Sequence, residues 1–255
     1  MPSISGHNLL IIGGSAGIGA AVAKLAAADG VNVAIASSNP DRIEKTIKAI
    51  KDALPMKAIN ISGFVCDVSH NDAEDRLEKL LTDVTAALGG PLDHIAYTAS
   101  LLEFKSVSEV TMEWITQTSG QLPFVVPALL GKLAPRFMNI TPTSSLVFTN
   151  GRITDKPIKG LAILAGWATA LTGFARSLAV EIAPIRVNLV SPGSTDTDHH
   201  GPPEVRIPKM AAVAKASLLG KVGTAEDVAE AYIYLMKDSN CTGSTVSTEG
   251  GSLLQ

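Results

Sequence analysis

The sequence contains few cysteines, few aromatic residues and no long apolar run. Its two cysteines, Cys66 and Cys241, are too few and too far apart for a disulfide framework or a four-cysteine zinc site. A reduced compartment follows, and we expect the protein in the cytoplasm. No uninterrupted apolar run approaches the roughly 18 residues of a membrane span, so no membrane partner is expected.

Positive charge is also in short supply. Lys and Arg number 21 against 24 Asp and Glu, which gives a formal net charge of −3 over 255 residues. A chain of this balance has no basic face for phosphate backbones, so nucleic acid is not an expected partner. Only 18% of the residues are charged and 46% are hydrophobic, so we expect one large core and a buried subunit interface.

Apolar runs of strand length alternate with longer segments of helical period along the chain. Strands are expected at residues 9–12, 31–36, 59–66, 94–98, 146–149, 186–190 and 243–247. Helices are expected at residues 17–29, 40–54, 71–87, 111–133, 162–182 and 224–236. This alternation predicts an α/β fold: one Rossmann-like domain over residues 1–255, with a doubly wound seven-stranded parallel sheet and helices on both faces. Residues 195–216 show no clear period, and we expect an insertion there that covers the substrate as a lid.

The first expected strand runs into a glycine-rich turn that opens the first expected helix. Glycines permit the tight turn and the close approach of a pyrophosphate, and the helix N-terminus supplies free N–H groups and partial positive charge. Strand, glycine turn and helix together are the context that a dinucleotide site requires. The predicted cofactor residues here are Gly13, Ser15, Ala16, Gly17, Ile18 and Gly19.

The end of the second expected strand indicates which dinucleotide binds. It carries Ser37, Ser38 and Asn39, with Arg42 three residues later. A carboxylate at this point favours NAD, whereas hydroxyls and a cation suit the 2′-phosphate of NADP. NADP(H) is therefore the expected cofactor. A helix cap followed by a solvated arginine would use the same residues, and this alternative stays open.

Five motifs in register resemble the short-chain dehydrogenase/reductase family over essentially the whole chain. They are the glycine turn, Asp67-Val68, residues 184–193, residues 222–229, and the final Thr242-Gly243 with residues 249–251. The resemblance implies an oxidoreductase whose cofactor also contacts Ala99, Pro192, Gly193, Thr195 and Thr197, with Thr197 near the nicotinamide carboxamide. Asp67 could accept from the adenine amino group or could simply cap a helix. A homodimer or homotetramer is implied, because the family pairs subunits through the helices that correspond to residues 111–133 and 162–182.

The family's proton-transfer groups are missing. Its usual reaction needs a Tyr that donates the proton, a Lys that lowers the pKa of the Tyr, a Ser that orients the substrate and an Asn that holds a relay water. Counted along this sequence, the Asn, Ser, Tyr and Lys positions fall on Ser119, Asn150, Leu164 and Ala168. Neither leucine nor alanine transfers protons, so ordinary alcohol dehydrogenase activity is not expected. Asn150 is the one candidate catalytic residue, and its alternative role is to cap the turn after the strand.

The sequence is also similar to an atypical branch of the family that lacks the Tyr and Lys. Residues 93–99, 133–135 and 183–188 carry this similarity. Some members, from fungal indole-alkaloid pathways, reduce an iminium ion with NADPH and steer a Diels–Alder cyclisation. An iminium carbon already carries positive charge, so position and electrostatics can suffice without a proton donor. The branch's arginine and acidic residue correspond to Pro123 and Ile158 here, so its bifunctional activity does not transfer directly.

The resemblance therefore implies an atypical NADP-dependent reductase of secondary metabolism that acts on an activated, apolar, iminium-type or imine-type substrate. Two alternatives stay open. One is a redox-neutral cyclase or isomerase in which NADP is structural, and the other is a non-catalytic partner subunit that binds the cofactor.

A few remaining polar and aromatic residues have ordinary structural interpretations. His199 and His200 lie in the expected lid, but no further residues stand at metal-ligand spacing, so no metal is expected. Tyr97, at the end of the fourth expected strand, has no partnered lysine nearby and is predicted to be a core or pocket-wall residue.

Overall fold

The sheet is parallel throughout and has seven strands. The computed structural model describes residues 2–57, 59–101, 103 and 105–255. The strands pair in the order β3-β2-β1-β4-β5-β6-β9, and the order reverses between β1 and β4. Their bounds are β1 (Asn8–Ile12), β2 (Asn32–Ser37), β3 (Ile61–Val65), β4 (His94–Tyr97), β5 (Ser145–Thr149), β6 (Arg186–Pro192) and β9 (Thr245–Thr248). The predicted fold class is confirmed, and ligands of such sheets bind where the order reverses.

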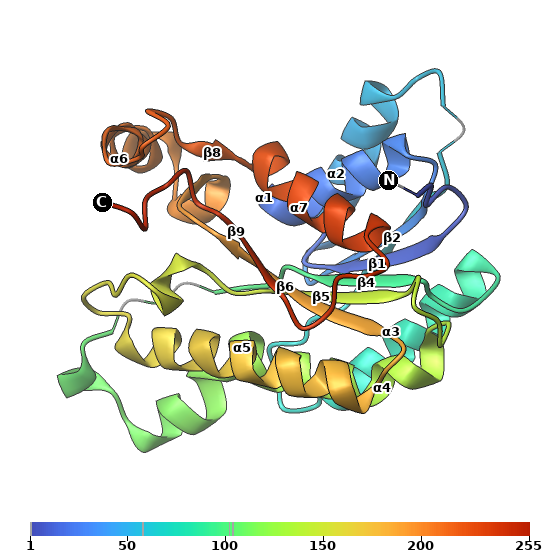
Figure 1. The fold of residues 1–255 in the computed structure, drawn as a ribbon, viewed down its shortest axis with the longest axis horizontal. Helices are drawn as coiled ribbons and strands as arrows, with labels where there is room; N and C mark the ends of the chain where they lie inside the picture. The colour runs from blue at the N-terminus through green and yellow to red at the C-terminus, as the bar shows by residue number, and fades with distance from the viewer. Residues whose placement is uncertain (1, 58, 102, 104) are drawn as a thin grey trace.

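Helices cover both faces of the sheet (Figure 1). One layer holds α1 (Gly17–Ala28), α2 (Pro40–Ala53) and α7 (Ala225–Lys237), and the other holds α3 (Ala73–Leu88), α4 (Val126–Phe137) and α5 (Ala162–Glu181). Side chains of successive strand residues enter opposite cores: Leu9 packs in the first layer's core and Leu10 in the second's. The inner strands β1 and β2 are nearly continuous apolar runs because both faces of the sheet are buried there, whereas the edge strands β3 and β9 are partly exposed.

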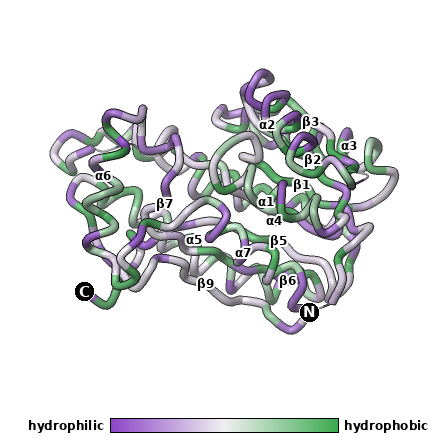
Figure 2. Tube along the Cα trace, turned by 90° about the horizontal axis from the view of Figure 1, so that it is seen from above, coloured by the Kyte–Doolittle hydropathy of each residue, from purple (hydrophilic) through white to green (hydrophobic). Residues whose placement is uncertain are grey.

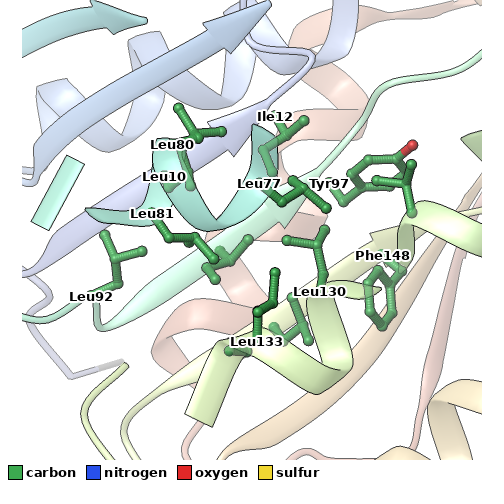
Figure 3. Packing of buried hydrophobic residues seen from close by; sticks show 14 of the residues in the cluster. Leu10, Ile12, Leu77, Leu80, Leu81, Leu92, Tyr97, Leu130, Leu133 and Phe148 are labelled. Carbon is green, nitrogen blue, oxygen red and sulfur yellow. The ribbon is translucent and has the colours of Figure 1, made fainter. Parts of the chain in front are cut away.

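Tyr97 belongs to the core beneath the second helix layer. Figure 3 shows its ring among Ile12, Leu77 and Phe148. The side chain is 1% exposed, and its hydroxyl donates to the carbonyl of Leu122 at 2.8 Å. Burial raises the pKa of Tyr97 far above its ordinary value. Tyr97 is thus a core residue, as predicted, and is not placed to exchange protons with a substrate.

The prediction of one regular helix at residues 111–133 is wrong. Two π-helical segments, η2 (Trp114–Ser119) and η3 (Gln121–Val125), precede α4, which continues to Phe137. Pro123 and Pro127 have no amide hydrogen, so the regular hydrogen bonds to the carbonyls four residues earlier cannot form there. Wider turns at such points are a common result and frequently occur near functional sites.

Residues 195–216 are more ordered than expected. They form β7 (Thr195–Asp196), the 3₁₀ turn η5 (Asp198–His200) and α6 (Pro203–Lys215), and β7 pairs with β8 (Gly223–Thr224). Pro203 stands in the first helical turn, where a missing N–H costs nothing, whereas Pro208 lies inside the helix and obscures its period. Figures 1 and 2 show α6 beside the C-terminus, at one end of the molecule.

The helix α5 is long and apolar enough to cross a membrane by length and composition, the one such helix in the described part of the chain. Only 22% of its most apolar window is buried within the single chain. The core helix of a layered α/β protein passes the same test, and α5 lies along the sheet (Figure 1). Its exposed face carries small residues, including Gly166, Ala170 and Gly173.

Candidate functional site

The glycine turn after β1 requires glycine for steric reasons. Gly13 has a φ of 92°, and a Cβ at this residue would lie 2.5 Å from the backbone nitrogen of Ala99. A Cβ on Gly19 would lie 2.3 Å from the carbonyl oxygen of Gly13. The structure therefore brings Gly13, Gly19 and Ala99, three predicted cofactor residues, to one point at the end of the sheet.

The N-terminus of α1 opens onto the same point. Its N-cap residue, Ala16, has no polar side chain and makes no capping hydrogen bond. Thr197 approaches from the far end of the chain: a Cβ on Gly17 would lie 3.3 Å from the Thr197 Cγ2 atom. Uncapped N–H groups, a helix dipole and a cradle that a Cβ would fill are what a dinucleotide pyrophosphate requires. The residues present thus fit an NAD(P) cofactor.

The end of β2 carries the polar residues for which two roles were considered. The Ser15 hydroxyl donates to the Ser37 hydroxyl oxygen at 2.7 Å, which leaves the proton of Ser37 available to a ligand. Asn39 caps α2, since its Oδ1 accepts from the backbone nitrogen of Arg42 at 3.0 Å. The side chains of Ser38 and Arg42 are exposed. The capping role of Asn39 is therefore observed, and the 2′-phosphate role of the serines and the arginine stays a prediction.

Asp67 is engaged in a local turn after β3. Its Oδ1 accepts from the backbone nitrogen of Ser69 at 3.0 Å and from the Ser69 hydroxyl at 2.7 Å, and its Oδ2 lies 3.3 Å from His70 Nε2. These hydrogen bonds, that to the Ser69 hydroxyl first, lower the pKa of the Asp67 carboxyl. The adjacent Val68 is buried. An adenine contact would have to share the carboxylate with this turn.

A tight turn follows β6, at the predicted nicotinamide end. A Cβ on Gly193 would lie 2.8 Å from the Cα of Glu249, so only glycine fits between these two chain segments. The hydroxyl of the buried Thr195 donates to the carbonyl of Gly193 at 3.2 Å. These contacts fix the turn that contains Pro192, Gly193 and Thr195. The chain then continues to Thr197, which lies beside the glycine turn.

The two residues predicted to correspond to the family's Tyr and Lys are apolar side chains on α5. Leu164 is half-buried and Ala168 is buried. Asn150 follows β5, and its amide nitrogen donates to the Thr172 hydroxyl at 3.1 Å. Its Oδ1 is buried and has no hydrogen-bond partner among the described residues. Asn150 is thus anchored to α5 and retains one free acceptor, which suits a donor group better than an oxyanion.

Ser119, the residue predicted to correspond to the family's Asn, makes hydrogen bonds within the protein. It accepts from the indole nitrogen of Trp167 at 3.1 Å and donates to the carbonyl of Ile115 at 3.0 Å. Trp167 in turn stacks on Phe124, with ring centroids 5.7 Å apart. Ser119 therefore fixes a tryptophan of α5, a contact that the sequence did not predict.

A cavity of about 310 Å³ lies between α6, the end of β9 and the turn after β5. Charged residues from three segments line it: Arg152, Lys209, Lys221 and Glu249. None of these was a predicted site residue, because the four come from positions almost 100 residues apart. The sequence offered one signal for this cavity: Arg152 follows soon after a strand of the parallel sheet, and ligands bind at the carboxyl ends of such strands.

Of the two histidines in the expected lid, His200 contacts Lys209, which lines this cavity. Lys209 donates to the Nδ1 of His200 at 3.1 Å. Burial, then the charge of Lys209, lowers the pKa of both His199 and His200. Among the residues that the structure describes, no group of three or more potential ligands gathers around them.

Comparisons with known proteins agree with this geometry. A family model for the SDR-like Rossmann domain matches residues 3–255. The chain is 52% identical to the short-chain dehydrogenase/reductase ATR9 of Stachybotrys chlorohalonatus, over 100% of both chains. It is 37% identical to the short-chain dehydrogenase/reductase malC of Malbranchea aurantiaca, over 99% of this chain and 96% of that one.

A solved structure matches over the same extent. The MalC reductase/Diels–Alderase of Malbranchea aurantiaca superposes with a TM-score of 0.92 at 35% identity, covering 98% of this chain and 97% of the other. The family model, the relatives and the solved structure each match nearly the whole chain, and the observed fold and glycine turn agree with them. The chain belongs to the short-chain dehydrogenase/reductase family, whose Rossmann fold normally binds NAD(P).

Proposed function

We propose that this protein is an NADP(H)-dependent oxidoreductase that reduces an activated, largely apolar substrate of iminium or imine type. The proposal is supported by a glycine turn and helix end that fit a dinucleotide, together with Leu164 and Ala168 on α5 at the positions predicted to correspond to the family's Tyr and Lys. When bound, the cofactor would supply a hydride. The chain's own residues would hold and orient the reactants and exclude water from them.

The chemistry of an iminium ion suits such a site. Hydride adds to the carbon of the C=N⁺ bond, and the π electrons pass to nitrogen, which becomes a neutral amine without receiving a proton. A ketone differs, because its oxygen becomes an alkoxide that must be protonated or stabilised. The free acceptor Oδ1 of Asn150 would suit an N–H or cationic donor in the substrate.

The preference for NADP(H) rests on the residues at the end of β2. Ser37 keeps a free hydroxyl proton, and Arg42 is exposed on the first turn of α2. Hydroxyls and a guanidinium are the groups that bind a phosphate in charge-assisted hydrogen bonds.

The test compares two probes of similar shape. Purified protein and NADPH are mixed with either the N-methyl dihydroisoquinolinium cation or the ketone tetralone, and the loss of nicotinamide absorbance is followed against enzyme-free controls. We expect oxidation of NADPH with the iminium probe and none with the ketone. The proposal fails if the folded protein does not bind NADPH, or if it reduces tetralone as fast as the iminium probe.

A redox-neutral cyclase is the second candidate. It is favoured by the similarity to a protein described as a reductase/Diels–Alderase, at 35% identity over nearly the whole chain. In that case the cofactor would shape or charge the pocket. Product formation with oxidised cofactor or with none would support the cyclase, and strict dependence on NADPH turnover would exclude it.

A further inference from the structure

The cavity beside the candidate site has an apolar body. Ala212 and Val213 of α6 and Ala216 just after it contribute one wall, and Val222 extends it toward β8. The cavity, about 310 Å³ in volume, adjoins the predicted catalytic region at two points. Arg152 follows Asn150 by two residues, and Ser194 follows the predicted nicotinamide residue Gly193.

Arg152 is a half-buried cation without a counterion. It stands in the 3₁₀ turn η4 (Arg152–Thr154), and its Nη1 donates to the Ser252 hydroxyl at 3.3 Å. Within the described residues no carboxylate lies within 4.0 Å of its guanidinium. A guanidinium has five N–H donors, and that of Arg152 uses one of them in a long hydrogen bond to the neutral Ser252 hydroxyl.

Lys209 of α6 supplies a second cation to the same cavity. Its ammonium donates to the Nδ1 of His200, whose pKa is lowered by burial and by the charge of Lys209. A neutral imidazole accepts the hydrogen bond but does not offset the charge. Among the described residues, no carboxylate lies within 4.0 Å of the Lys209 ammonium group.

The remaining charges leave a surplus of one positive charge. Lys221 is paired with Asp227, with its Nζ 3.0 and 2.9 Å from the two carboxylate oxygens. Glu249 is the single carboxylate among the residues that line the cavity, and its Oε2 accepts from the backbone nitrogen of Leu253 at 3.2 Å. One carboxylate therefore stands against the two cations Arg152 and Lys209.

We propose that this cavity binds a carboxylate carried by an otherwise apolar substrate, and that Arg152 is the residue that pairs with it. The planar fork of a guanidinium matches a carboxylate in two parallel hydrogen bonds, and the apolar wall of α6 would cover the carbon skeleton. This inference rests on the proposed function, because it treats the cavity as the part of the substrate site farthest from the reacting atoms. It adds that the substrate is an acid.

The experiment uses two ligands that differ in charge and little else, naphthoate and naphthamide. Each is titrated calorimetrically into the full-length protein, with and without saturating NADP⁺, at neutral pH. A bidentate charge-assisted pair is worth about 1.5–3 kcal/mol, so naphthoate should bind about 10- to 100-fold more tightly than naphthamide. Equal affinity for the two ligands would overturn the proposal.

Three variants assign the effect to the cavity. Arg152→Gln should remove most of the preference for naphthoate, whereas Arg152→Lys, which keeps the charge, should retain part of it. Glu249→Gln should strengthen naphthoate binding, because it removes the opposing charge and keeps an acceptor for Leu253. Arg76→Gln, on the exposed surface of α3, is the control and should change nothing.

The outcomes separate this inference from the proposed function. A preference for naphthoate that Arg152→Gln leaves intact would overturn the assignment to Arg152. A preference that Arg152→Gln abolishes would support it even if the protein oxidises no NADPH, in which case the proposed function alone would fail.

Discussion

The substitution Gly17→Ala tests the cofactor cradle most sharply, because a second glycine supplies a matched control. Gly17 has a φ of 50°, and its new Cβ would lie 3.3 Å from Thr197 Cγ2, in the gap between α1 and the segment after β6. Gly6 has a φ of 81°, and a Cβ there would meet nothing within 4 Å. Both substitutions should cost about 1–2 kcal/mol of folding stability, since alanine is strained in the left-handed region.

Cofactor binding should separate the two variants. The Cβ at residue 17 would hold a pyrophosphate oxygen away from the N–H groups of the first turn of α1. The loss of one charge-assisted hydrogen bond costs about 1.5–3 kcal/mol, so the Kd for NADPH should rise roughly 10- to 100-fold in Gly17→Ala. In Gly6→Ala the Kd should stay that of the parent protein.

Urea denaturation measures the stability of both variants, and NADPH fluorescence titration measures the affinity. Equal NADPH affinities for Gly17→Ala and Gly6→Ala, with both proteins folded, would show that the pyrophosphate does not lie between α1 and Thr197. The assigned position of the cofactor would then be wrong.

Three further predictions follow from other parts of the molecule. Ser37→Asp should shift cofactor preference from NADPH toward NADH by at least about 5-fold in relative Kd, because a carboxylate about 4 Å from a phosphate charge costs about 1 kcal/mol in water and about 4 kcal/mol at an effective dielectric constant of 20. An unchanged ratio in paired titrations would show that the 2′-phosphate does not lie at the end of β2. Burial, then the charges of His7 and Arg186, lowers the pKa of His94 from 6.5 to about 3, so the unfolded chain binds a proton there more readily than the folded one, and folding stability should be lost as the pH falls from 6.5 toward 3. The urea midpoint should fall less steeply over this pH range in His94→Gln than in the parent protein. Parallel midpoint-against-pH curves for the two proteins would contradict this role of His94. Ala170→Arg, on the exposed face of α5, should convert the expected dimer to a monomer in light scattering, and a parent protein that is itself monomeric at micromolar concentration would refute the predicted assembly.

The parts of the fold that were predictable are those governed by local pattern. The glycine turn could be predicted because Gly13, Gly17 and Gly19 follow an apolar strand and open an alanine-rich helix, so periodicity and sterics agree. The sheet could be predicted because a parallel strand buried on both faces is apolar at every position. The polar pair Ser15 and Ser37, 22 residues apart, meets because both follow neighbouring strands at the same edge.

The parts that were missed depend on contacts between distant segments. The helix pattern at residues 111–133 is genuine, but it does not show that residues 114–119 and 121–125 form π-helical turns before α4 begins. The helix α6 was hidden because Pro208, inside it, interrupts its helical period.

The candidate site shows the same division. That Leu164 and Ala168 lie one turn apart on the same helix could be predicted, because a helix fixes the spacing of its own residues. The cavity around Arg152 could not, because its walls come from the turn after β5, from α6 and from the end of β9. Pairwise contacts such as Trp167 with Ser119 likewise depend on how α5 packs on the π-helical segment.

Hydride transfer without a side-chain proton donor is the central claim, and a pH profile with labelled cofactor tests it most directly. NADPH that carries deuterium at the transferable position is reacted with the N-methyl dihydroisoquinolinium cation at saturating concentrations, from about pH 7 to 9, where a Tyr–Lys pair of lowered pKa would titrate. The account predicts deuterium at the former iminium carbon and a rate that varies less than about twofold over this range. A product without deuterium, or a rate that falls about tenfold per pH unit as a donor is lost, would contradict it.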